Sequence, residues 1–129
     1  MSDEKITITE LEAELVNYYG TERYYKGGAL FPNMVYTDGV NAMAKRVGAY
    51  WLVDLVFSYQ NNENPAVVEA PFQIWTLKVN ADNTAVVTCK EDTNQPVLVE
   101  QEIEYTDFPV TDEFKLYFID GVCLLPSEY

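Results

Sequence analysis

One carboxylate, Asp54, lies in the middle of a segment that is otherwise free of charge, GAYWLVDLVFSYQ at residues 48–60. A carboxylate buried without a partner costs much free energy, so it must be hydrogen-bonded or protonated. Asp54 could therefore be a general acid or base, or a brace that binds a Tyr hydroxyl, the Trp51 indole or loop amides of residues 21–36. We favour the brace, because the sequence offers no second catalytic group to work with it.

Three more carboxylates alternate along the segment VLVEQEIEY at residues 97–105. In a β-strand with its period of two, Glu100, Glu102 and Glu104 project from one face. Such a row is usually a solvated outer face. It could also be a linear acidic ridge that docks on a basic groove, in imitation of a phosphate backbone.

The composition argues against most catalytic and metal-binding constellations. There is no histidine, so neither a Ser-His-Asp triad nor a Cys-His pair can form. Two distant cysteines cannot supply a zinc site, and Gly27-Gly28 lacks the spacing of a phosphate-binding loop. We predict no catalytic residue, no metal site and no cofactor, although a two-carboxylate hydrolase is not formally excluded.

The net charge is −13, from 21 acidic and 8 basic residues. This balance disfavours nucleic-acid and anionic-membrane binding, which depend on Lys and Arg, and favours attraction to basic surfaces. The polar N-terminus predicts no secretory signal, and no apolar run approaches the ~20 residues of a membrane span. We expect a cytoplasmic protein in which Cys89 and Cys123 are reduced core residues.

Two helices and then strands are predicted along residues 1–129, which form a single domain. Thr7 and Glu10 form a capping box for a first helix that Gly20 ends, and Thr37 or Asp38 caps a second helix that reaches about Gln60. The predicted strands cover residues 72–79, 84–89, 97–105, 114–119 and 122–125, with a hairpin at Asp120-Gly121. The fold class is α+β, with two N-terminal helices packed on a four- to five-stranded antiparallel meander.

A continuous second helix would place Asp54 on one face with Tyr50, Trp51 and Ser58, which is the face that its first half turns to the core. A pocket or polar network could form where this face meets the Tyr-rich segment 21–36. An enzyme or small-ligand binder with its site there is the main alternative to a protein-binding domain. Self-association of two copies through the apolar second half of the helix also stays open.

Several blocks are similar to a family of uncharacterised small proteins from bacteria, plasmids and phages: GTERYY (20–25), VYTDGV (35–40), GAYWLVDLVFSYQ, FQIWTLKV, EYTDFP (104–109) and LLPSEY (124–129). The resemblance spans most of the chain. It assigns no activity and no site residue. It implies a single cytoplasmic domain encoded on a phage or mobile element.

Together these observations predict a small acidic, non-enzymatic binding protein. Its partner would be a basic protein surface, for which a nucleic-acid-handling host factor fits a mobile-element origin. A modulator or inhibitor of that factor is the corresponding function.

Overall fold

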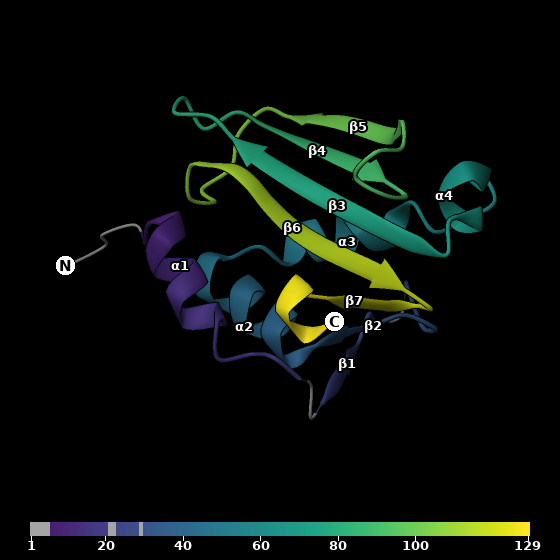
Figure 1. The fold of residues 1–129 in the computed structure, drawn as a ribbon, viewed down its shortest axis with the longest axis horizontal. Coiled ribbons are helices and arrows are strands. Elements are labelled where there is room, and N and C mark those ends of the chain that lie inside the picture. The colour runs from purple at the N-terminus through teal and green to yellow at the C-terminus, as the bar shows by residue number, and fades with distance from the viewer. Residues whose placement is uncertain (1–5, 21–22, 29) are drawn as a thin grey trace.

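The computed structural model describes residues 6–20, 23–28 and 30–129 as an α+β fold in which helices cover one face of a seven-stranded sheet (Figure 1). In chain order, the elements of these residues are α1 (Ile8–Leu15), β1 (Tyr24–Lys26), β2 (Val35–Thr37), α2 (Asp38–Val47), α3 (Tyr50–Ser58), α4 (Pro65–Glu69), β3 (Phe72–Val79), β4 (Ala85–Lys90), β5 (Val97–Ile103), β6 (Thr111–Ile119), β7 (Val122–Leu124) and the 3₁₀ helix η1 (Pro126–Glu128).

The strands are arranged in the order β1-β2-β7-β6-β3-β4-β5. All neighbours are antiparallel except β2 and β7, which are parallel. The predicted meander is therefore wrong in its topology: after β3, β4 and β5, the chain returns to place β6 on the other side of β3. The spatial order β6-β3-β4-β5 is that of a Greek key.

The connection from β5 to β6 crosses the end of the sheet and is anchored there by backbone and side-chain hydrogen bonds. The Thr106 amide donates to the Asn83 carbonyl (2.9 Å), and Asn83 Nδ2 donates to the Thr106 carbonyl (3.0 Å). Asn83 has a positive φ of 70° in the β3–β4 turn, a conformation that Asn tolerates better than most residues. Phe108 inserts into the core from the same connection.

The Tyr-rich segment 21–36, interpreted from the sequence as a loop, contains β1 and the first two residues of β2 in its described part. Each strand has three residues, which is too short for a period-two pattern to be recognised. Strand β2 pairs with β7 near the C-terminal end of the described chain, with Tyr36 opposite Cys123. This contact joins residues that are distant in sequence, so no local pattern predicts it.

The predicted long second helix is two helices, α2 and α3, which are separated at Gly48. Gly48 adopts a left-handed conformation with φ 67°, and the Ala49 amide donates to the Ala44 carbonyl at 2.8 Å. This is the Schellman arrangement that ends many helices, and glycine adopts its left-handed residue without steric cost. The prediction of Thr37 as N-cap is confirmed: its hydroxyl accepts a hydrogen bond from the Val40 amide.

Helix α3 lies behind β3 and β6 in Figure 1, whereas α2 contacts β1, β2 and β7, and both helices share one core with the inward side chains of the sheet. On β3, alternate residues Gln73, Trp75, Leu77 and Val79 are buried, and β4 contributes a similar inward row. The predicted strands at 72–79 and 122–125 match β3 and β7 closely, whereas β5 ends two residues early and β6 begins earlier, at Thr111. None of the helices in the described part of the chain combines the length and apolarity needed to cross a membrane.

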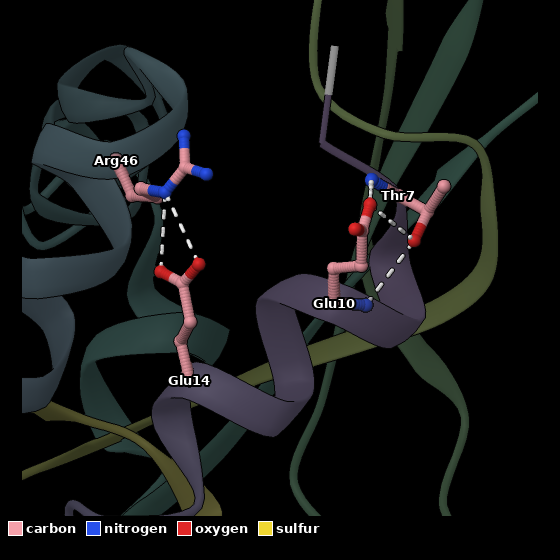
Figure 2. Close-up of polar contacts among 4 residues, drawn as sticks. All are labelled: Thr7, Glu10, Glu14 and Arg46. Atoms are coloured by element: carbon pink, nitrogen blue, oxygen red, sulfur yellow. Dashed lines mark hydrogen bonds and ion pairs between the residues drawn. The ribbon is translucent and has the colours of Figure 1, made fainter. Parts of the chain in front are cut away.

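Helix α1 begins with the predicted capping box, which is confirmed (Figure 2). The Thr7 hydroxyl accepts from the Glu10 amide at 3.2 Å, and Glu10 Oε1 accepts from the Thr7 amide at 3.0 Å. The helix ends at Leu15, and the predicted end at Gly20 is wrong. The hydrogen bond from the Thr7 amide is the main reason why the pKa of Glu10 lies below its ordinary value of 4.5.

The capping box predicts a pH-dependent contribution to stability. Because folding lowers the pKa of Glu10, the contribution is present above the unfolded-state pKa and is lost as the pH falls through the folded-state pKa. We expect Glu10→Gln to be less stable than wild type at pH 7 and equal to it well below pH ~4. Urea unfolding at several pH values measures this difference. Thr7→Ala should cost about 1 kcal/mol at pH 7, and a pH-independent cost of Glu10→Gln would contradict the role of its carboxylate.

Candidate functional site

The carboxylates at the β5 edge of the sheet form the first candidate site, which we call the acidic edge: Glu100, Glu102 and Glu104. Among the described residues, β5 is an edge strand of the sheet and pairs with β4, with Glu100 opposite Thr88 and Glu102 opposite Val86. All three carboxylate-bearing side chains are exposed. Glu104 follows the last residue of the strand, so the strict alternation predicted for 97–105 holds only as far as Ile103.

The opposite face of β5 carries the packing that holds this edge strand in place. Val99 is buried in the core, and Gln101 and Ile103 are half-buried. The Tyr59 hydroxyl donates to Gln101 Oε1 at 2.6 Å, which ties α3 to the edge strand. The acidic edge therefore contributes little to the core, and its side chains can be changed with little effect on packing.

The acidic edge has no ion pair with a cation among the described residues. The outer face of the sheet carries Lys78 on β3, Lys90 on β4 and Lys115 on β6. Lys115 pairs with Glu113 at 2.8 Å, and this hydrogen bond raises the pKa of Lys115. Within residues 6–20, 23–28 and 30–129, no ion pair reaches Glu100, Glu102 or Glu104. The outer face as a whole has mixed charge, and only its β5 border is uniformly acidic.

Asp54 is exposed, which contradicts the prediction that it is buried as a brace or as a catalytic acid. The break at Gly48 is the reason, because it resets the rotation of α3 relative to α2. Tyr50, Asp54 and Ser58, spaced four residues apart, line the solvent side of α3, while Leu52, Val53, Leu55, Val56 and Phe57 are buried. Asp54 still acts at a distance on half-buried Tyr36, whose pKa is raised mainly by burial, then by Tyr50 and Asp54.

The other residues predicted for a network around Asp54 have separate partners. The Tyr50 hydroxyl donates to Asn41 Oδ1 at 2.8 Å, and the Ser58 hydroxyl donates to the Leu55 carbonyl at 2.7 Å. Half-buried Trp51 borders a shallow hollow that Tyr105 and Asp107 also line. The structure therefore does not bring these residues together into one polar network.

A buried brace does exist, but it is built from amides. Gln73 is 2% exposed and exchanges two hydrogen bonds with Gln60, of 2.7 and 2.9 Å. Its Oε1 also accepts from Trp75 Nε1 at 2.9 Å, and its Nε2 donates to the Val67 carbonyl at 2.9 Å. The signal was present in the alternation of FQIWTLKV, which places Gln73 on the same face as Trp75.

The second candidate site is a cleft of about 810 Å³ between α1, α2 and β1. Arg23 and Tyr25 of the predicted Tyr-rich segment line it together with Lys45 and Arg46 of α2. A pocket between the second helix and segment 21–36 was one predicted alternative. The structure has a cleft in that position, but Asp54 is not among its lining residues.

Neither cysteine offers a reactive group. Cys89 and Cys123 are free and buried, as predicted. Burial raises the pKa of Cys89 to about 12 and also strongly raises that of Cys123, so neither forms the nucleophilic thiolate near neutral pH. In the part of the chain that the structure describes, no group of three or more Cys, Asp and Glu residues is placed to hold a metal ion.

The comparisons with known proteins identify a family without an assigned activity. No curated protein and no solved structure matches the chain. One family model, described as a family of unknown function (DUF6876), matches residues 9–129 and therefore spans all the elements from α1 to η1 except the first residue of α1. The chain belongs to this family of unknown function, DUF6876.

Proposed function

We propose that this protein is a cytoplasmic, non-enzymatic binding domain that docks its acidic edge on a basic protein surface. The observation that carries the proposal is the exposure of Glu100, Glu102 and Glu104 without a cation partner among the described residues. Charges that stabilise the fold would be expected to have partners, whereas these three have no cation partner in the described part of the chain. Successive side chains on one face of a strand lie ~6.8 Å apart, which gives a regular row of negative charge.

The summed charge of the chain supports the same partner class. A net charge of −13 on 129 residues attracts cationic surfaces over distances of a Debye length, ~10 Å at 0.1 M salt. Such a field accelerates encounter by ~10-fold to 10³-fold. A host factor that handles nucleic acid presents a basic groove of this kind, and the protein would act as its modulator or inhibitor. Origin from a phage or mobile element, implied by the sequence blocks, fits that role.

The acidic edge is tested by reversing its charges against a matched control. We expect Glu100→Lys/Glu102→Lys/Glu104→Lys to remain folded and to lose partners that wild type captures from host lysate at low salt. The control Glu12→Lys/Glu63→Lys/Glu69→Lys changes three exposed carboxylates elsewhere and alters the net charge equally. With a captured partner in purified form, the association rate of the edge variant should fall by ~10-fold or more, while the control should change less.

Two results would refute docking through the acidic edge. Equal losses in the two triple variants would mean that only net charge matters. Unchanged capture by both variants would mean that the acidic surface serves solubility alone. Higher salt should weaken capture by wild type more than residual capture by the edge variant, because screening acts on charges that the variant lacks.

A small-ligand binder or enzyme is the second candidate function. From the sequence, the pocket of such a protein is expected near Asp54 and the Tyr-rich segment 21–36. One observation now favours a ligand site next to that segment: the cleft between α2 and β1, which Arg23 and Tyr25 line without Asp54.

A further inference from the structure

Three basic residues of this acidic protein meet at one cleft. Of the 8 Lys and Arg residues in the chain, Arg23, Lys45 and Arg46 all line the cleft between α1, α2 and β1. Lys45 and Arg46 lie in the last turn of α2, where the helix dipole favours cations. The dipole does not explain Arg23, which precedes β1 and reaches the cleft from another part of the fold.

The acidic residues of the cleft leave its cationic character in place. Glu14 contacts Arg46 through Nε, at 3.1 and 3.3 Å, and Figure 2 shows the two terminal guanidinium nitrogens directed away from Glu14. Asp38 accepts a hydrogen bond from the Arg23 amide at 3.2 Å. Lys45 is exposed and makes no ion pair within the described residues. Among the described residues that line the cleft there are three cations and two carboxylates, and Glu10 of α1 also interacts electrostatically with Arg46.

The walls of the cleft also include aromatic rings that are held in place. Tyr25 is half-buried and stacks on Tyr36, with ring centroids 5.5 Å apart and planes inclined by 18°. Tyr18 is half-buried, and the Ser127 hydroxyl donates to its backbone carbonyl at 2.6 Å, which fixes the main chain of Tyr18. The stacked ring of Tyr25 beside cations suits a ligand that combines a ring with an anionic group, since rings stack while phosphate binds Arg and Lys.

We propose that this cleft binds a small phosphate-bearing compound that carries an aromatic ring, of the size of a mononucleotide. The volume of about 810 Å³ lies within the ~300–1,000 Å³ that is usual for small-molecule sites. Lys45 and the terminal nitrogens of Arg46 contact the phosphate, and the ring lies against Tyr25. This site is separate from the acidic edge, so the proposal for the cleft can be tested independently of docking on a basic protein.

The test is a titration of the isotopically labelled protein, followed by NMR, with AMP, adenosine and inorganic phosphate as probes. We expect AMP to cause saturable shifts at Tyr18, Tyr25 and Lys45, and to bind more tightly than either adenosine or phosphate. Lys45→Glu should weaken AMP binding by at least about tenfold, since it removes a charge-assisted hydrogen bond. The matched control Lys78→Glu makes the same charge change on the outer face of the sheet and should bind AMP as wild type does.

Each other outcome would overturn the proposal wholly or in part. No saturable shift at millimolar AMP, or equal weakening in Lys45→Glu and Lys78→Glu, removes the site. Equal affinity for AMP and inorganic phosphate removes the aromatic part and leaves a phosphate site alone. The acidic-edge variant Glu100→Lys/Glu102→Lys/Glu104→Lys should retain AMP binding, which separates a failure here from a failure of protein docking.

Discussion

Replacing Gln73 by Met should lower the free energy of unfolding by about 2–3 kcal/mol, although Met fills nearly the same space. The side chain of Gln73 uses all four of its hydrogen-bonding positions: Oε1 accepts from Gln60 and Trp75, and Nε2 donates to Gln60 and Val67. Met would leave the Trp75 indole buried without a partner, at a cost of ~1–3 kcal/mol, and would remove one of the two hydrogen bonds to the Val67 carbonyl, which keeps the Ala70 amide as a donor. Chemical unfolding followed by circular dichroism measures the change.

A double-mutant cycle with Gln60 separates the hydrogen bonds from changes in packing. Gln60→Met alone should also destabilise, because it removes the amide that faces Gln73. The double variant should cost less than the sum of the two single variants, since each single variant already breaks the reciprocal pair. Gln95→Met, at an exposed loop position, is the control and should change little. Additive costs, or a Gln73→Met change below ~1 kcal/mol, would contradict a coupled buried network.

The starts of α1 and α2 could be predicted because they depend on neighbouring residues, whereas the starts of α3 and α4 were not predicted. Thr7 with Glu10, and Thr37 with Val40, satisfy backbone amides three residues away, and both caps are confirmed. The alternation of FQIWTLKV likewise predicts β3 within its own sequence. Asp120 and Gly121 have positive φ values of 51° and 80° and form the predicted hairpin turn. This turn requires only two residues that tolerate positive φ, so it is visible in the local sequence.

The misplacement of Asp54 shows how one local signal changes a whole face of a helix. Gly48 was visible in the sequence as a residue that can end a helix, but the long apolar run around it favoured a continuous one. Once the helix ends there, Asp54 shares the outer side of α3 with Tyr50 and Ser58. A helical wheel assigns faces correctly only within one uninterrupted helix.

The candidate sites also combine features that follow from a local pattern with features that follow from tertiary packing. The outward direction of Glu100 and Glu102 follows from strand alternation and could be predicted, whereas the position of β5 at the sheet edge requires the whole strand order. A pocket between the second helix and segment 21–36 was an alternative prediction, but its lining could not be predicted, because Arg23 meets Lys45 and Arg46 only through the packing of β1 on α2. Contacts between distant segments depend on tertiary packing and leave no periodic pattern.

Among the carboxylates of the described residues, Glu128 should contribute most to the stability of the fold, because it binds the start of a helix that lies far from it in sequence. Its Oε1 accepts from the Thr37 hydroxyl at 2.6 Å and from the Leu125 amide at 2.9 Å, and its Oε2 accepts from the Gly39 amide at 3.1 Å. Gly39 lies in the first turn of α2, whose unpaired amides and dipole favour an anion. The carboxylate thus joins η1 to α2.

Glu128→Ala should therefore lower the free energy of unfolding by about 2–3 kcal/mol, since hydrogen bonds to charged groups are worth ~1.5–3 kcal/mol and Thr37 is left buried with an unmet donor. Glu69→Ala removes an exposed carboxylate without a partner among the described residues, and should change stability by less than ~0.5 kcal/mol. Hydrogen exchange at the Gly39 amide should accelerate in Glu128→Ala and not in the control. Equal stability of the two variants would show that the carboxylate does not hold α2.

Gly39→Ala tests the same junction from the helix side. A Cβ at this position would lie 2.6 Å from Leu125 Cδ1 and 2.7 Å from Glu128 Oε1, which is closer than atoms in contact can approach. The methyl group must displace the Glu128 carboxylate or the Leu125 side chain, so a cost of about 1–3 kcal/mol is expected although alanine favours helices. In Glu128→Ala one of the two obstacles is gone, and Gly39→Ala should then cost less than it does in wild type. An undiminished cost would place the close packing at Leu125 alone.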